Sequence, residues 1–254
     1  MLVIRHAQMT VFGREAQARF EEGLVELFLR HYPRECRQAG GQAQIRQLVR
    51  QGVHAAAVRG YSTKRQVSVY VSLTFILGAD FVHDPQLPWV ADCLSEDAIA
   101  DPTLRLDNLF KETLDYLGAT AGEHAEWIVR AMLRIRAFDL ATVPDSQGDQ
   151  WIADVCEILK GFYPQKFEHQ GAEATRVMIA DGIVRAAEYG LQHPRGVFVF
   201  VTLMFMLGSG FDRDPLHPWA SAVLQDASLA DETDRALRMH AQALTHIEQS
   251  LSPD

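Results

Sequence analysis

The sequence predicts an all-α protein made of two tandem copies of a unit of about five helices, packed as one pseudo-symmetric body. Two observations predict this class. Residues 71–89 match residues 201–219 at a shift of 130 positions, with 10 of 19 residues identical. The segments around both stretches carry apolar residues at helical spacing and are separated by glycine and proline.

The internal match continues on both sides of this segment and sets the expected boundaries. Tyr32-Pro33 meets Tyr163-Pro164 at a shift of 131, and two glycines, Gly52 and Gly60, recur at a shift of 130. We therefore predict a first repeat at 1–117, a connector at 118–134 and a second repeat at 135–254. The connector becomes amphipathic after its small residues, which favours a packed segment over a free linker.

Each helix of the first repeat has an identifiable start or stop. The residue before Pro33 is pushed out of the helical region, Thr63 or Ser62 can cap a helix start, and Gly60 and Gly78 can end helices. The expected helices are 7–31, 43–59, 64–77, a short one from Pro88-Trp89 and a last one from Asp101-Pro102 to 117.

Segments 67–77 and 197–207 leave two secondary structures open. They are β-branched and aromatic, so their composition also suits buried strands. Their length exceeds that of a typical strand, and the second one lacks polar alternation. We predict buried helices that the others surround.

Both repeats contain the pattern G-x-x-F-x-x-D-P-x-x-P-W, for which we predict a structural role. In this role glycine ends the buried helix, the aromatic residues fix the loop on the core, and aspartate accepts backbone N–H bonds. The alternative is a hydrolase or metal-dependent enzyme that uses Asp84 and Asp214, with Asp212, His83 or His217 nearby. The motif residues are Gly78, Phe81, Asp84, Pro85, Pro88, Trp89, Gly208, Phe211, Asp214, Pro215, Pro218 and Trp219.

No other catalytic, cofactor or metal site is predicted. None of five histidines compared between the repeats falls on a histidine of the other copy, and no HExxH, CxxC, GxSxG or phosphate-binding glycine motif occurs. The three cysteines, Cys36, Cys93 and Cys156, are expected to act as small core hydrophobes. A non-enzymatic protein is the favoured class, and a helical small-molecule sensor with a pocket between buried helices is a further alternative.

Charge is unevenly distributed along the chain. The net charge is −9, of which residues 1–117 contribute −1 and residues 118–254 contribute −8. Residues 30–65 hold eight basic groups against Glu35 alone, and Arg46 and Arg50 fall opposite Val177 and Asp181. We predict that this basic region binds a protein with an acidic surface, or docks on the acidic second repeat. Its proposed contact residues are Arg34, Arg37, Arg46, Arg50, Arg59, Lys64 and Arg65.

Other partners and compartments are disfavoured. Few exposed aromatic residues are expected among the arginines, which argues against nucleic acid. The longest apolar run, 197–207, is too short for a membrane span, and the first residues lack a signal-peptide core. With an odd number of widely spaced cysteines, these features predict a cytoplasmic protein without membrane insertion.

The order of these features resembles a family of bacterial proteins that accompany secreted-toxin and type VI secretion spike-cargo genes. The resemblance rests on Ile4-Arg5 before a long helix, a Tyr-Pro stop, and the buried segment with its L-G-x-x-F-x-x-D-P-x-x-P-W motif. It covers both repeats and carries no catalytic residues. It implies an accessory role as an adaptor or co-chaperone for cargo loading, or as an immunity-type binder.

Overall fold

The computed structural model describes residues 6–252, with side chains from Glu15 onward, and this part of the chain consists of helices without strands. The all-α prediction is therefore confirmed. Segments 67–77 and 197–207 are helical, so the strand alternative is wrong. Ile4-Arg5, which the family resemblance uses, lies outside the described residues.

The first half of the described chain, up to residue 121, forms six α-helices and one 3-10 turn. A 26-residue helix, α1, leads into a short helix and then into a pair that packs closely. The elements are α1 (His6–His31), α2 (Pro33–Gln38), α3 (Gln42–Val58), α4 (Lys64–Leu77), a 3-10 turn (Phe81–His83), α5 (Pro88–Leu94) and α6 (Pro102–Ala121).

The second half contains seven α-helices and one 3-10 turn. Its first helix, α7, begins within the predicted connector 118–134. The elements are α7 (Glu126–Ala137), a 3-10 turn (Leu140–Thr142), α8 (Gly148–Phe162), α9 (Pro164–Gln170), α10 (Ala172–Glu188), α11 (Pro194–Leu207), α12 (Pro218–Leu224) and α13 (Glu232–Leu251).

Several helix ends follow the expected local chemistry. Thr63 accepts a bond from the Gln66 amide, and the Gln66 side chain accepts from the Thr63 amide, which forms a capping box. Asp101 caps α6 by accepting from the amides of Thr103 and Leu104, and Gly78 ends α4 with a φ of 96°. Local sequence therefore fixes where these helices begin and end.

The structure contains more helices than the predicted five per unit. The chain does not stay irregular after Tyr32 or Tyr163, because the following proline starts a short helix, α2 or α9. Helix α6 also continues four residues past 117, and the connector is divided at Gly122 between the end of α6 and α7.

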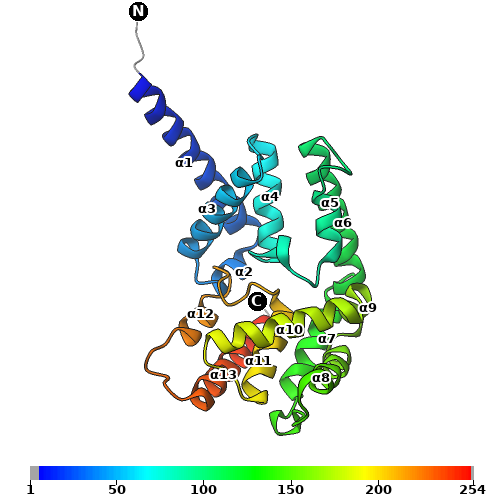
Figure 1. Cartoon of the computed structure of the whole chain (residues 1–254). Helices are drawn as coiled ribbons and strands as arrows, with labels where there is room; N and C mark the ends of the chain where they lie inside the picture. Colours follow the sequence, from blue (N-terminus) through cyan, green and yellow to red (C-terminus); the bar gives the residue numbers. More distant parts are fainter. Residues whose placement is uncertain (1–5, 253–254) are drawn as a thin grey trace, which may run out of the picture.

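Two hydrophobic cores form, one in each half, and a different helix lies at the centre of each (Figure 1). Helix α4 packs against α3 and α6, whereas α11 packs against α10, α13 and α8. From Val197 to Phe205 every residue of α11 is buried, as expected for a helix that is apolar all round. Both central helices end where the two halves of the chain meet.

Glycine permits a close approach between helices in each half. A Cβ atom on Gly182 of α10 would lie 2.7 Å from Val201 Cγ2 and 2.9 Å from Met204 Sδ, both on α11. A Cβ atom on Gly52 of α3 would lie 3.0 Å from Val71 Cγ2 on α4. Any larger residue at Gly182 would therefore require its neighbours on α11 to shift, and one at Gly52 would require a smaller adjustment of Val71.

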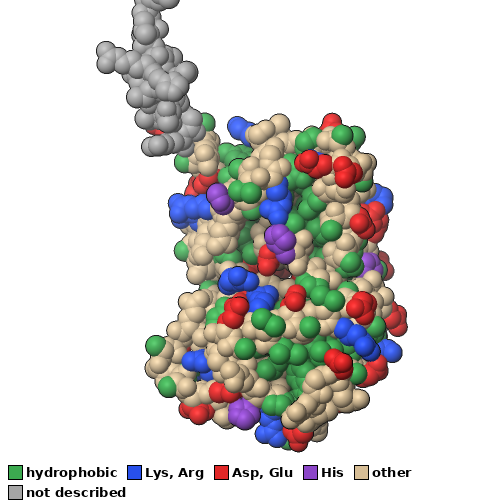
Figure 2. Space-filling view, viewed as in Figure 1, with side chains coloured by type: hydrophobic (Ala, Val, Ile, Leu, Met, Phe, Trp, Pro, Cys, Tyr) green, Lys and Arg blue, Asp and Glu red, His purple; other side chains and the backbone are tan. Residues whose placement is uncertain are grey.

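The surface mixes charged and apolar side chains. Figure 2 shows basic and acidic side chains interspersed on the visible face, with apolar side chains between them. No helix of the described residues has the length and apolar character needed to cross a membrane.

We predict opposite effects for two glycine-to-alanine substitutions. Gly182→Ala should lower the free energy of unfolding by about 1–3 kcal/mol, because the added methyl group overpacks the contact with α11. Gly118→Ala, in the interior of α6, should raise it by about 0.5–1 kcal/mol, because the added Cβ would have no neighbouring atom within 4 Å. Urea unfolding measures both, and equal effects would contradict the close packing of α10 on α11.

Candidate functional site

The two copies of the G-x-x-F-x-x-D-P-x-x-P-W motif meet where α4 and α11 end. A Cβ atom on Gly78 would lie 3.5 Å from Asp214 Oδ2 and 3.6 Å from the Leu207 carbonyl oxygen. A Cβ atom on Gly208 would lie 3.4 Å from the Leu77 carbonyl oxygen and 3.6 Å from Asp84 Oδ2. Each glycine thus lies against the other half of the chain.

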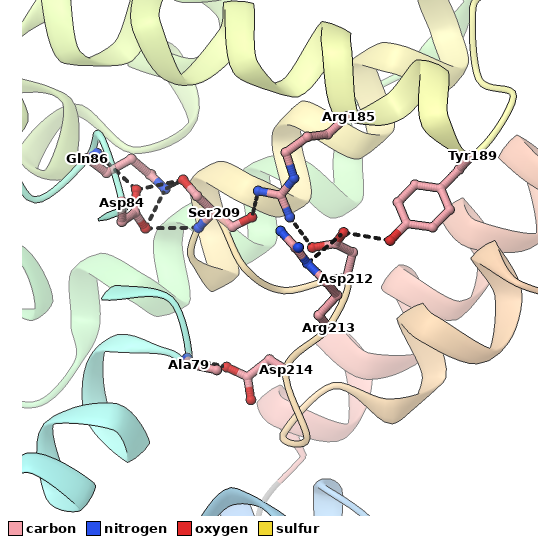
Figure 3. Close-up of polar contacts among 9 residues, drawn as sticks. All are labelled: Ala79, Asp84, Gln86, Arg185, Tyr189, Ser209, Asp212, Arg213 and Asp214. Atoms are coloured by element: carbon pink, nitrogen blue, oxygen red, sulfur yellow. Dashed lines mark hydrogen bonds and ion pairs between the residues drawn. The ribbon is translucent and has the colours of Figure 1, made fainter. Parts of the chain in front are cut away.

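The two motif aspartates exchange hydrogen bonds across this junction (Figure 3). The Ala79 amide donates to Asp214 Oδ2 at 2.8 Å, and the Ser209 amide donates to Asp84 Oδ2 at 2.9 Å. In both cases the donor is the residue directly after the motif glycine of the other half. Sequence reasoning predicted bonds to backbone amides but not that they would join the halves.

Each aspartate also forms a local Asx turn. Asp84 Oδ1 accepts from the Gln86 amide at 2.9 Å, and Asp214 Oδ1 accepts from the Leu216 amide at 2.8 Å. Both carboxylates are buried, with exposed fractions of 6% and 2%. A buried carboxylate must be compensated by donors, and these amides supply them.

Asp84 is held by more donors than Asp214. The Ser209 hydroxyl donates to Asp84 Oδ1 at 2.6 Å, and Gln86 Nε2 lies 3.3 Å from Asp84 Oδ2. Gln86 Nε2 also donates to the Met204 carbonyl oxygen at 2.8 Å, near the end of α11. Burial raises the pKa of the Asp214 carboxyl, against the opposing effect of its amide bonds.

A second polar cluster continues from Ser209 toward the surface. Arg185 donates to the Ser209 carbonyl oxygen and forms an ion pair with Asp212, which is 2% exposed. Tyr189 donates its hydroxyl to Asp212 Oδ2 at 2.8 Å, and burial and then this carboxylate raise the pKa of Tyr189 to about 12. Asp212 is thus bound by side chains of α10 and its following residue (Figure 3).

The remaining motif residues lie in the cores or begin helices. Phe81 packs against Tyr70, and Phe211 against Phe200, at centroid distances of 5.4 Å and 5.0 Å. Pro88 and Pro218 occupy the first turns of α5 and α12. Pro85 and Pro215 follow the two aspartates directly, and Trp89 and Trp219 are partly buried against the two cores.

Two partly buried histidines contact each other in the second half of the chain. The rings of His217 and His246 are 5.5 Å apart, and Trp219 lies 5.8 Å from His246. Burial lowers the pKa of each histidine to about 4, and His217 Nδ1 has no hydrogen-bond partner. His83 is exposed and bonds to Asp80.

The groups proposed for an enzyme therefore fall into separate contact sets. Asp84 and Asp214 face backbone amides, Asp212 pairs with Arg185, and His217 contacts His246. Within the described residues no three His, Cys, Asp or Glu side chains are grouped so that they could hold a metal ion. The three cysteines are buried and unpaired, and burial raises the pKa of each thiol.

The predicted basic region is spread over α2, α3 and the start of α4 rather than gathered at one point. Arg34 donates to carbonyl oxygens at the end of α13, including those of Gln249 and Ser250. Arg46 pairs with Glu22 at 2.8 Å, and Arg65 pairs with Asp107 at 2.9 Å. Arg59 lies over the Tyr70 ring, whereas Arg37, Arg50 and Lys64 are exposed.

Several polar residues of the junction carried no signal in the sequence. Gln86 and Ser209 occupy variable positions of the shared motif, and Lys166, Arg185 and Tyr189 belong to no motif. None of them recurs at the matching position of the other half of the sequence, so a search for shared residues could not find them. A buried lysine or glutamine is recognised only from its exposure in the structure.

Asp84→Asn should destabilise the protein more than Asp214→Asn. Asparagine replaces one carboxylate oxygen with an NH₂ group, and in either orientation of the amide this group faces a hydrogen-bond donor. Asp84 accepts from four donors and Asp214 from two, so Asp84→Asn disrupts more bonds. We expect about 0.5–2 kcal/mol for Asp214→Asn and a larger loss for Asp84→Asn in urea unfolding at pH 7.

The cost of Asp214→Asn should also depend on pH. Because the folded-state pKa of Asp214 is raised, the folded protein holds its proton longer than the unfolded chain does, and ionisation lowers stability as pH rises from about 4. The asparagine variant lacks this loss, so the difference in free energy of unfolding between the wild type and the variant should shrink between pH 4 and pH 7. The control is Asp226→Asn in an exposed Asx turn, where hydrogen bonds from Ser228 lower the pKa of the carboxyl, so the deficit of this variant should not shrink as the pH rises. An Asp214→Asn deficit that is independent of pH would contradict the prediction.

Acid should destabilise the protein through the histidine pair. The folded-state pKa of about 4 lies below the ordinary value of 6.5, so the unfolded chain binds protons first and stability falls as pH drops from 6.5 to 4. His246→Tyr, which copies Tyr116 at the matching position of the first half, should flatten this fall. Unfolding free energies at pH 7, 6 and 5 test this, and an unchanged slope in the variant would refute it.

Comparisons with protein-family models, with curated proteins and with solved structures found no match for this chain. The resemblance to proteins that accompany type VI secretion and toxin cargo genes therefore stays a prediction.

Proposed function

We propose that the chain is a non-enzymatic protein-binding adaptor or co-chaperone, built from two tandem copies of one unit. The observation that carries this proposal is the outward face of α3, which presents the exposed Arg50 while the opposite face of the helix is buried in the first core. The family resemblance suggests a secreted effector or toxin as the partner, consistent with a cytoplasmic cargo-loading role.

The helix boundaries support the tandem duplication. Helices α3 to α6 begin at residues 42, 64, 88 and 102, and α10 to α13 begin 130 residues later in each case. Asp84 and Asp214 lie 130 residues apart and make matched bonds to the opposite half. A pseudo-two-fold arrangement of two copies accounts for both facts.

This register corrects one comparison made from the sequence. With α3 and α10 aligned from end to end, Arg46 corresponds to Arg176 rather than Val177, and Arg50 corresponds to Ala180. Arg46 is moreover bound to Glu22. Arg50 is therefore the residue on this face whose charge is specific to the first copy.

The environment of Arg50 suits a partner contact. It is exposed one turn from Arg46, and the described part of the chain offers it no ion pair within 4.0 Å. Val58, at the end of the same helix, is 70% exposed. Arginine and exposed apolar residues on one helix form a composition enriched where proteins bind one another.

The alternative of a carboxylate-based enzyme has weaker support. A catalytic pair needs carboxylate oxygens that reach a substrate, whereas both Asp84 and Asp214 are buried and their oxygens already accept amide hydrogens. Asp212 is likewise bound by Arg185 and Tyr189. These contacts favour a role in holding the halves together.

Affinity purification from the native host tests the adaptor proposal. The wild-type chain should retain a stoichiometric protein, and Arg50→Glu should reduce its recovery by at least about tenfold, because a reversed charge repels an acidic surface. Raising the salt concentration should weaken the wild-type complex.

The control is Arg136→Glu, at an exposed arginine of α7 far along the chain from α3. Its melting temperature and that of Arg50→Glu should equal the wild-type value, which separates binding from folding. If no stoichiometric protein is recovered, or if Arg50→Glu retains it as well as Arg136→Glu does, the proposal is wrong.

A further inference from the structure

A cavity of about 170 Å³ lies at the junction, on the side covered by α7. Both halves and the segment between them contribute to its wall, through Leu77, Leu117, Met132, Tyr163 and Leu207 among others. A cavity of about 150 Å³ in another protein is large enough to admit benzene. This space is therefore large enough for a small organic molecule.

Apolar space continues beyond the cavity. A narrower slot of about 50 Å³ shares Met132, Met206 and Leu207 with it and extends between α7, α11 and α13. Phe138, Phe162 and other apolar residues form most of the slot wall. Methionine side chains adapt their shape readily, so an apolar chain of some length can follow this path.

Lys166 provides a buried cation in the cavity wall. It is 7% exposed, and its Nζ donates to the Phe205 carbonyl oxygen at 2.5 Å, near the end of α11. An ammonium group has three N–H donors, and within residues 15–252 no carboxylate lies within 4.0 Å of it. Burial lowers its pKa to about 8, with the charge of Asp84 opposing, so the group is mostly protonated at pH 7.

Gln86 provides an unused acceptor in the same wall. The residue is 1% exposed, and its Oε1 has no hydrogen-bond partner although its Nε2 donates to Met204, Ser209 and Asp84. Gln86 and Lys166 donate to carbonyl oxygens of consecutive residues, Met204 and Phe205, so their polar ends lie near each other. A buried acceptor without a donor costs free energy that a ligand hydrogen would recover.

We propose that this cavity binds a small amphiphilic acid, with its carboxylate on Lys166, a neighbouring hydroxyl on Gln86 and its apolar chain along α7 and α11. The carboxylate supplies the anionic acceptor that the buried ammonium lacks, and the hydroxyl supplies the donor that Gln86 Oε1 lacks. The aliphatic residues of the wall favour a ligand with an apolar chain over one that is polar throughout.

Isothermal titration with 3-hydroxyoctanoate, octanoate and octan-1-ol tests the site on the full chain. The hydroxy acid should bind at a 1:1 ratio and more tightly than octanoate, and the alcohol should bind most weakly. Lys166→Met should weaken 3-hydroxyoctanoate by at least about tenfold, because it removes a charge-assisted hydrogen bond but keeps the apolar volume.

Lys160→Met is the matched control, because Lys160 is an exposed lysine of the same half that does not line the cavity. The affinity of this variant for 3-hydroxyoctanoate should equal that of the wild type. If Lys166→Met does not fold, Leu117→Trp, which fills the cavity from α6 and leaves Lys166 in place, should abolish binding instead. No saturable binding of the hydroxy acid, or equal binding to Lys166→Met, would overturn the proposal. Octanoate binding as tightly as the hydroxy acid would overturn the role of Gln86.

This inference does not depend on the adaptor proposal. Arg50→Glu should leave 3-hydroxyoctanoate binding unchanged, because α3 contributes nothing to the cavity wall. Failure of ligand binding in the titration and failure of partner recovery in the purification are therefore distinguishable results.

Discussion

The exchange of hydrogen bonds between the Asp84 and Asp214 loops is the contact on which the relative placement of the two halves depends. Burying a carboxylate costs free energy unless hydrogen-bond donors surround it. One of the two donors of Asp214 is the Ala79 amide of the first half, and the amide that donates to Asp84 Oδ2 is that of Ser209 in the second half. Separating the halves would leave two amides and two carboxylates without these partners. Directional hydrogen bonds therefore specify how the halves meet, in addition to apolar packing.

This exchange explains why glycine ends both central helices. Gly78 and Gly208 have φ values of 96° and 97°, which would strain any other residue, whereas a Cβ atom at either position would make only ordinary contacts with the carbonyl oxygens of Leu207 and Leu77. Helices α4 and α11 must stop at this point for Ala79 and Ser209 to present their amides. The two apolar helices and the two polar loops therefore depend on each other. Packing sets where the helices end, and hydrogen bonding sets how the ends meet.

The sequence predicted most of the helices because their signals are local. Thr63, Asp101 and Gly78 act on residues within one turn, so their effect is visible in a short window. It also predicted that Asp84 and Asp214 accept backbone amides, since an Asx turn needs only the residue two positions on. The amides of Ala79 and Ser209 are more than 120 residues away from their acceptors, and no local pattern indicates them. Similarly, a count of charges could not reveal that Arg34 and Arg46 already have partners within the chain.

Under the proposed duplication, the two sides of the junction share their backbone contacts but differ in their side chains. Ser209 stands where the first copy has Ala79, Gln86 where the second has Leu216, and His246 where the first has Tyr116. On one side Lys166 and Gln86 line an open cavity, whereas on the other His217, His246 and Trp219 pack against one another. Backbone bonds that tolerate such substitutions hold the frame constant while each side acquires its own chemistry. A fused pair can therefore bind asymmetric ligands, because one side can change without the other, which two identical subunits cannot do.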